Sequence, residues 1–318
     1  MDDNKLLQKL SQNLLEILND DEYCDITIEV GDDPYVKVFR AHMNILNYRS
    51  SYLRRVLSTI ERRNDEPLIH IKLPNIILPE IFQIILRYIY GGRLSLEEYD
   101  ALDIIKILVA ASELSLQELV DYIQSFLTKN KADWMEQNFN LIYQTSFEKG
   151  SFLELQKYCT NLISNNPNKI FKSLDFSTTP EKLLILIIQN DNLQMTEIQV
   201  WENVLKWGFA QNPGFPSDPS NFSKDDFTSL KNTLHQCIPF VRFYNLTSKE
   251  FFYNVVPYKK ILPKELYMDL LKTFLDPDSK PIDKPKPRKG TNNSSETSSS
   301  KYQDEDRMNE DYYYSQVF

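Results

Sequence analysis

The sequence predicts an α+β domain, a small mixed sheet capped by helices, followed by an all-α helical domain and a disordered C-terminal tail. Three observations predict this order. Apolar residues alternate around a hydrophilic turn near the N-terminus, they follow helical spacing almost continuously from Gly92 to Leu275, and they almost disappear from Asp276 onward. The length of 318 residues favours two domains of roughly 150 residues each.

The first element after the N-terminal region is a predicted β-hairpin. Ile26, Ile28 and Val30 alternate with polar residues before the turn at 31–34, and a second apolar run at 35–39 follows it. Alternation with a period of two places the apolar side chains on one face of a strand. The hairpin therefore supplies one buried face of a sheet.

Helical spacing replaces alternation directly after the hairpin. Ser50 and Ser51 lie between two short apolar groups and supply an N-cap signal for the second helix. The apolar positions of the two predicted helices are Met43, Ile45, Leu46, Tyr52, Leu53, Val56 and Leu57. These helices would cap the sheet.

The order of these blocks resembles the BTB (POZ) domain. Asp25 opens the first strand, Ala41-His42 closes the second, and residues 49–53 match the Arg-Ser-x-Tyr-apolar pattern of the cap. The stretch 69–92 is similar to the family's third strand, Leu-Pro turn, long amphipathic helix and Tyr-x-Tyr-Gly end. The resemblance implies a BTB/POZ domain over residues 21–130.

Residues 1–20 are predicted to form an amphipathic helix, because leucines recur at three- and four-residue spacing. Two interpretations are open: the helix lies on the core of its own domain, or it is a dimer arm that packs against the partner's core. The family resemblance favours the arm and implies a homodimer. The interface residues that we expect are Leu6, Leu10, Leu14 and Asp25.

Asp25 departs from the family pattern in its surroundings. The resemblance implies a basic residue directly after Ala-His that pairs with the acid, and this chain has Met43 there. An unpaired buried carboxylate is costly. We therefore expect either that Arg40 or Arg49 compensates the charge or that Asp25 is partly solvated.

Residues 131–275 are predicted to form the all-helical domain. The segment 197–207, with its final Trp207, resembles the signature helix of the BACK domain, and the stretch 238–275 is similar to the helices that follow it. Asn203 replaces the alanine that is usual in the signature helix, which bears on the packing of that turn. The resemblance implies a BACK-like domain.

Residues 276–318 are predicted to be a disordered tail. The segment begins with prolines, continues with a Ser/Thr/Asn run, and ends with acidic and tyrosine residues, with almost no aliphatic periodicity. Proteins of the BTB-BACK type usually continue into kelch repeats or a TLDc domain, and neither is evident here. The chain thus resembles a truncated or divergent member.

Composition argues against several classes of partner. The net charge of −9 disfavours nucleic-acid binding, which needs concentrated Lys and Arg. The longest wholly aliphatic run, 183–188, is far shorter than the ~20 residues of a membrane span. Three widely separated cysteines predict reduced thiols. We expect a cytoplasmic protein, with the nucleus as the alternative.

The sequence offers no catalytic, cofactor or metal site. Its seven glycines form no phosphate-binding loop of known type, and its three histidines are dispersed. We expect His42 to be a hydrogen-bonded core histidine at a strand end and His70 to face solvent on a strand. A non-enzymatic protein follows.

Two classes of function therefore compete. In the first, implied by the resemblance, the chain is a substrate adaptor of a cullin-family E3 ubiquitin ligase with an unknown protein substrate. The cullin contacts would be Tyr52, Leu53, Val56, Ile60 and Glu61. The family's apolar-x-acid motif is shifted, since Glu61 directly follows Ile60. In the second class, the BTB domain oligomerises a scaffold for signalling or regulatory partners without cullin binding.

Overall fold

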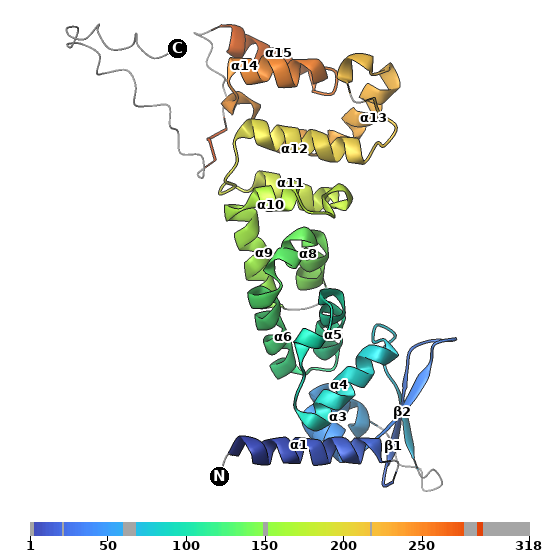
Figure 1. The fold of residues 1–318 in the computed structure, drawn as a ribbon. Coiled ribbons are helices and arrows are strands. Elements are labelled where there is room, and N and C mark those ends of the chain that lie inside the picture. The colour runs from blue at the N-terminus through green and yellow to red at the C-terminus, as the bar shows by residue number, and fades with distance from the viewer. Residues whose placement is uncertain are drawn as a thin grey trace, which may run out of the picture.

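The computed structural model describes residues 3–20, 22–59, 68–148, 152–216, 218–276 and 285–288. The molecule is elongated: the sheet and α1 lie at one end, and successive helices stack away from them toward α15 at the other (Figure 1). A small mixed sheet with helices precedes a helical region, so the predicted fold class is confirmed.

The N-terminal α+β part contains three strands and the helices around them. Its elements are α1 (Asp3–Asn19), β1 (Ile26–Val30), β2 (Lys37–Ala41), α2 (Met43–Arg49), α3 (Ser51–Ser58), β3 (Ile69–Lys72), α4 (Pro79–Gly91), α5 (Ala101–Glu113) and α6 (Gln117–Asn130). The strand order is β2-β1-β3, with β1 antiparallel to β2 and parallel to β3. The sheet is therefore mixed, as predicted.

The alternation of β1 sets which face of the sheet is buried. Ile26, Ile28 and Val30 are all fully buried, whereas the residues between them are half-buried. Ile28 pairs with Phe39 on β2 and with Ile71 on β3, and both partners are also buried. One row of apolar side chains thus crosses all three strands and packs beneath the helices.

The cap helices are fixed by one buried serine. Ser50 Oγ accepts a hydrogen bond from the backbone N–H of Leu53 at 3.0 Å, which caps α3, and donates to the backbone oxygen of Leu114 at 2.7 Å. A hydroxyl can do both at once. The predicted N-cap therefore also ties α3 to the end of α5.

Every regular element between residues 132 and 275 is helical in the described part of the chain. The α-helices are α7 (Ala132–Gln137), α8 (Phe139–Glu148), α9 (Leu153–Asn165), α10 (Pro167–Phe171), α11 (Glu181–Gln189), α12 (Glu197–Ala210), α13 (Lys224–Leu234), α14 (Ser248–Glu250) and α15 (Lys264–Leu275). Short 3-10 turns and one π-helical turn, Phe251–Val255, connect some of them.

The predicted signature helix, α12, is tied to its neighbours by its two tryptophans. Trp201 Nε1 donates to the backbone oxygen of Asn254 and Trp207 Nε1 to that of Thr179, both at 2.8 Å. Asn203, at the atypical position, is half-buried, and its amide bonds to a carbonyl one turn earlier in the same helix. The substitution is accommodated because its polar group stays within α12.

The two parts of the chain join where α6 packs against α9. Gln124 of α6 is only 3% exposed, and its side-chain oxygen accepts from the backbone N–H groups of Glu154 and Leu155 in the first turn of α9. Ser125 adds a hydrogen bond to the Glu154 carboxylate. A side chain of one domain thus satisfies the otherwise unpaired helix N-terminus of the other.

Most of the predicted disordered tail lies outside the described residues. Its described segment, 285–288, differs from the prediction, because Arg288 is only 3% exposed and packs against the helical domain. A charged contact rather than aliphatic burial holds it, so hydrophobic periodicity could not have predicted it. Among the described residues, no helix combines the length and apolar character that crossing a bilayer requires.

Candidate functional site: a groove beside α1

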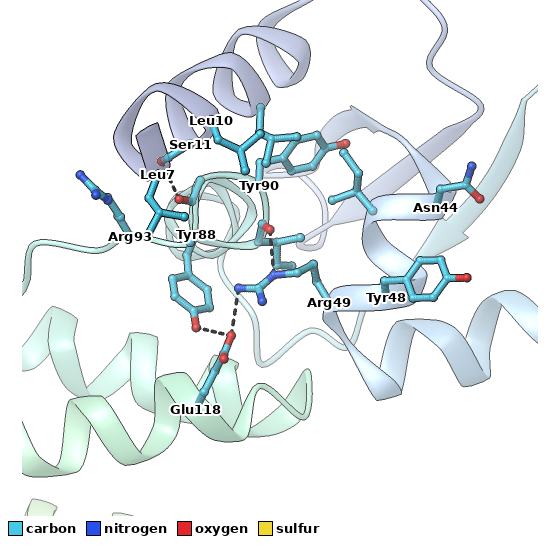
Figure 2. A pocket seen from close by; sticks show the side chains of 15 residues that line it. Leu7, Leu10, Ser11, Asn44, Tyr48, Arg49, Tyr88, Tyr90, Arg93 and Glu118 are labelled. Carbon is cyan, nitrogen blue, oxygen red and sulfur yellow. Dashed lines mark hydrogen bonds and ion pairs between the residues drawn. The ribbon is translucent and has the colours of Figure 1, made fainter. Parts of the chain in front are cut away.

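An apolar groove of about 700 Å³ lies between α1, α2 and the C-terminal end of α4 (Figure 2). Helix α1 contributes Leu7, Leu10 and Leu14, and α2 contributes Ile45 and Tyr48. The groove is open to solvent along the outer side of α1. It is the place where the sequence-predicted dimer residues Leu10 and Leu14 meet.

Helix α1 is held on its own domain by contacts with the end of α4. Ser11 Oγ donates to the backbone oxygen of Gly91 at 2.6 Å, and Leu15 packs over the same glycine. A Cβ at Gly91 would lie only 3.1 Å from Leu15 Cδ1. The glycine therefore permits the close approach of α1, and the own-core interpretation describes this inner face of the helix.

The outer face of α1 is left uncovered. Leu6, Leu7 and Leu10 are 56%, 61% and 56% exposed, and Tyr48 on neighbouring α2 is 78% exposed. Leu6 lies on this outer face but does not line the groove. Contiguous exposed apolar side chains of this kind mark interaction surfaces.

A polar network closes one end of the groove. Arg49 Nη2 lies 2.9 Å from the Glu118 carboxylate of α6, while Arg49 Nε donates to the backbone oxygen of Ile89 (Figure 2). The Tyr88 hydroxyl also donates to Glu118, at 2.6 Å. Burial, and then this hydrogen bond, raise the pKa of Tyr88 above its ordinary value. Tyr88 therefore remains a neutral donor.

Asp25 lies apart from the groove and has a local role. Its carboxylate accepts from the backbone N–H of Met43 at 2.7 Å, at the first residue of α2, whose N-cap residue His42 makes no side-chain capping bond to the helix. Asp25 is half-buried, which corresponds to the expected partial solvation, and Arg49 pairs with Glu118 instead. Asp25 thus stabilises a helix N-terminus from the neighbouring strand.

His42 is hydrogen-bonded at a strand end, as expected, but it is half-buried and not part of the core, and His70 faces solvent as expected. The backbone N–H of His42 donates to the Tyr90 hydroxyl at 2.8 Å, and the same hydroxyl lies 2.9 Å from His42 Nδ1. His70 is exposed on β3, with its Nδ1 3.0 Å from Thr27 Oγ1. Both histidines are thus explained by structural hydrogen bonds.

The residues predicted to contact a cullin differ in exposure. Tyr52 and Val56 are half-buried on α3, but Leu53 is 0% exposed and belongs to the core, so it presents no surface to a partner. Ile60 and Glu61 lie outside the described residues. Helical spacing alone could not distinguish the inner from the outer residues of this short helix.

Two observations on the described residues concern metal binding and cysteine nucleophiles. They contain no group of three or more His, Cys, Asp or Glu side chains arranged to hold a metal ion. Burial raises the pKa of Cys159 and of Cys237 to about 12, so both remain thiols and not nucleophilic thiolates at neutral pH. We expected all three cysteines to be buried, and Cys24 differs because it is only half-buried.

Several groove residues were not predicted from the sequence. Asn44, Tyr48 and Arg49 lie on α2, whereas Arg93 follows α4 and Glu118 lies on α6. Tyr48 carried no sequence signal of this role, because its 78% exposure is known only from the structure. The ion pair carried no signal, because its partners are far apart in sequence.

Comparisons with known proteins give the family context. The model of the BTB/POZ domain matches residues 14–131, and that of the domain named BTB And C-terminal Kelch (BACK) matches residues 142–213. BTB/POZ domain-containing protein 9 of Drosophila melanogaster is 25% identical over 210 residues, which are 66% of this chain and 27% of that protein. Kelch-like protein 41 of Mus musculus is 27% identical over 203 residues, which are 62% of this chain and 30% of that protein.

The matches thus span less than a third of the length of these two relatives. Among solved structures, the BTB domain of zebrafish PATZ1 matches with a TM-score of 0.30 and 19% sequence identity. That match covers 40% of this chain and 91% of the solved domain.

Proposed function

Since this chain carries a BTB/POZ domain followed by a BACK domain, we propose that it is a non-enzymatic interaction module that forms a homodimer and serves as substrate adaptor of a cullin-family E3 ubiquitin ligase. The observation that carries the proposal is the uncovered row Leu6, Leu7 and Leu10 beside the apolar groove. The protein would act by holding partners together, in the cytoplasm or the nucleus.

Self-association is supported by the chemistry of this face. A second copy offers the same leucines and the same groove, so one twofold arrangement can bury the row of each copy against the other. Charged residues are sparse at its centre and Tyr48 is prominent, which is typical of interface cores. The arm interpretation of α1 then applies to its outer face.

A single substitution tests the dimer. Leu10→Asp places a carboxylate in the apolar interface twice, once per copy, so the dimer dissociation constant should rise at least ~100-fold. Sedimentation velocity at micromolar protein measures this change. Leu174→Asp is the matched control, because Leu174 is 77% exposed on the helical domain. An unmodified chain that sediments as a compact monomer would contradict the proposal.

Cullin binding is supported by the family and by the surface of α3. Tyr52 and Val56 are the half-buried apolar residues there, and Arg55 lies over the Tyr52 ring at 5.7 Å. Ile60 and Glu61 follow in the chain. An apolar anchor surrounded by polar groups is a common source of interface energy.

Calorimetry of the full chain with a cullin N-terminal domain tests this step. We expect micromolar binding that Ile60→Asp weakens by about tenfold or more. Val38→Asp, at a valine that is 54% exposed on β2, should leave binding unchanged. Glu61→Lys reports whether the shifted acid contributes.

The scaffold function is the second candidate, and two observations favour it. Glu61 is off the family's motif spacing, and Leu53 is buried in the core, which leaves fewer apolar contacts on α3. An absence of binding heat at high micromolar protein, with the dimer intact, would establish the scaffold candidate over the adaptor. Equal binding by the Ile60→Asp variant would place the cullin interface elsewhere.

A further inference from the structure

A buried ion pair joins the segment 285–288 to the first turn of α12. Arg288 Nε donates to Glu197 Oε2 at 3.1 Å, and Arg288 Nη2 donates to Glu197 Oε1 at 3.2 Å. The side chains are 1% and 5% exposed. The two parallel bonds form the bidentate fork that a guanidinium makes with a carboxylate.

Two backbone carbonyls also accept hydrogen bonds from the guanidinium. Arg288 Nη1 donates to the oxygen of Asn190 at 3.0 Å, and Nη2 also approaches the oxygen of Phe240 at 3.4 Å. We call the Glu197 carboxylate and these two carbonyls the arginine socket. Its acceptors come from three separate segments of the helical domain and converge on one planar cation.

The backbone that precedes Arg288 is recognised as well. Arg242 Nη1 donates to the oxygen of Lys286 at 2.8 Å, and Asn245 Nδ2 donates to that of Pro285 at 3.4 Å. Arg242 is itself held by Asp191, and its backbone N–H donates to Glu197. The domain therefore binds the segment at three points: the carbonyls of Pro285 and Lys286 and the side chain of Arg288.

The physical chemistry of the socket selects arginine. A carboxylate that is nearly inaccessible to water needs a cation and hydrogen-bond donors, and one amide from Arg242 is not enough. A lysine ammonium is a point charge that cannot bond in a fork to the carboxylate and reach carbonyls on both sides. The prolines at 285 and 287 restrict the backbone, which lowers the entropy lost on docking.

We propose that the arginine socket is a peptide-binding site of the helical domain, specific for an arginine in a proline-flanked basic segment, and that the chain's own residues 285–288 occupy it. The site is independent of the dimer and of any cullin contact. A segment of the same chemistry supplied in trans binds once the internal one is removed.

The test is peptide binding to the full chain. Arg288→Ala empties the socket, and a fluorescent peptide of residues 283–290, DKPKPRKG, is titrated into the variant and followed by anisotropy. The unmodified chain should bind the peptide at least ~10-fold more weakly, because its own segment competes at high effective concentration. A peptide with Arg288→Lys should bind Arg288→Ala protein about tenfold or more weakly than DKPKPRKG does, because charged hydrogen bonds are lost.

A second protein variant identifies the socket itself. Adding Glu197→Gln to Arg288→Ala keeps the shape of the side chain and removes its charge, so peptide binding should be lost. Adding Glu202→Gln instead is the matched control, because Glu202 is exposed on the same helix. Absent binding to Arg288→Ala, equal binding of the arginine and lysine peptides, or binding that survives Glu197→Gln would each overturn the proposal.

Trypsin gives a readout that needs no peptide and no emptied socket. Lys280, Lys284 and Lys286 each precede proline, whose bonds resist trypsin, so Arg288 is the first susceptible site after Asp276. Cleavage after Arg288 should be slow in the unmodified chain and at least ~10-fold faster in Glu197→Gln, because the docked arginine cannot enter the protease. Cleavage after Lys301 in the same digest provides the reference rate. Equal rates after Arg288 in the two proteins would contradict docking.

Discussion

The groove beside α1 and the arginine socket differ in what fills them. The groove is apolar and open, with Leu7 61% exposed at its edge, whereas the socket is charged and closed over an arginine that is 3% exposed. An exposed leucine costs little in water, but a buried carboxylate without a cation is expensive. A folded monomer can thus leave the first site empty, while the second favours a ligand from its own chain.

The largest effect should come from emptying the socket. Arg288→Ala leaves Glu197 buried with one backbone donor, so the free energy of unfolding should fall by about 2 kcal/mol. This loss is smaller than the loss expected for breaking an ion pair in a core, because water can reach Glu197 once the segment leaves. Urea denaturation followed by circular dichroism measures it.

A substitution of the partner residue, Glu197, sharpens the comparison. Glu197→Gln frees the guanidinium to move into solvent together with its segment, so its cost should be smaller, about 1 kcal/mol. This asymmetry follows from Glu197 being fixed in α12 while Arg288 lies on a peripheral segment. If Arg288→Ala and Glu197→Gln lower the free energy of unfolding equally, the socket behaves as an ordinary structural ion pair.

An effect of similar size should show whether the packing of α1 on its own domain supports the groove. Gly91→Val pushes against Leu15 and displaces α1, which should lower the free energy of unfolding by about 1 kcal/mol. Self-association should weaken too, although no exposed leucine is changed. Gly214→Val is the control, because a Cβ there meets no atom within 4 Å. Unchanged association would separate α1 packing from the interface.

The smallest effect belongs to an exposed ion pair. Lys72 Nζ lies 3.1 Å from Glu29 on the sheet, and this hydrogen bond holds the pKa of Glu29 below its ordinary value of 4.5. Stability from the pair is therefore present above about pH 4.5 and is lost as the pH falls below it. Lys72→Met should slightly reduce the drop in melting temperature between neutral and acidic buffer. A drop as large as that of the unmodified chain would show that the pair contributes nothing.

The sequence supported the fold well because the relevant signals are local. Alternation at Ile26, Ile28 and Val30 and helical spacing after Met43 depend on neighbouring residues, and the buried positions agree with them. For α1 the spacing predicted an amphipathic helix but left open whether Leu10 packs on its own domain, and the structure shows Leu10 56% exposed. Leu53 marks the limit, because inner and outer positions of a short cap helix share one periodicity.

The residues of the groove and of the arginine socket that the sequence did not predict meet through contacts between distant segments. Arg49 and Glu118 meet across the groove, and Arg288 meets Glu197 across 91 positions. No spacing rule relates such partners, and a composition argument assigned Arg288 to a disordered tail. The bond from the backbone N–H of Met43 to Asp25 is a further contact that the sequence did not predict.

The Arg49–Glu118 pair also has a mechanical meaning. Glu118 lies on α6, and α6 is the helix on which α9 and the rest of the stack are mounted. The pair thus lies at the base of a long arm that ends at α15 (Figure 1). Together with the packing of α5 against α6, it sets the angle at which the arm leaves the sheet, and a change of a few degrees in that angle would displace the far end at α15 most.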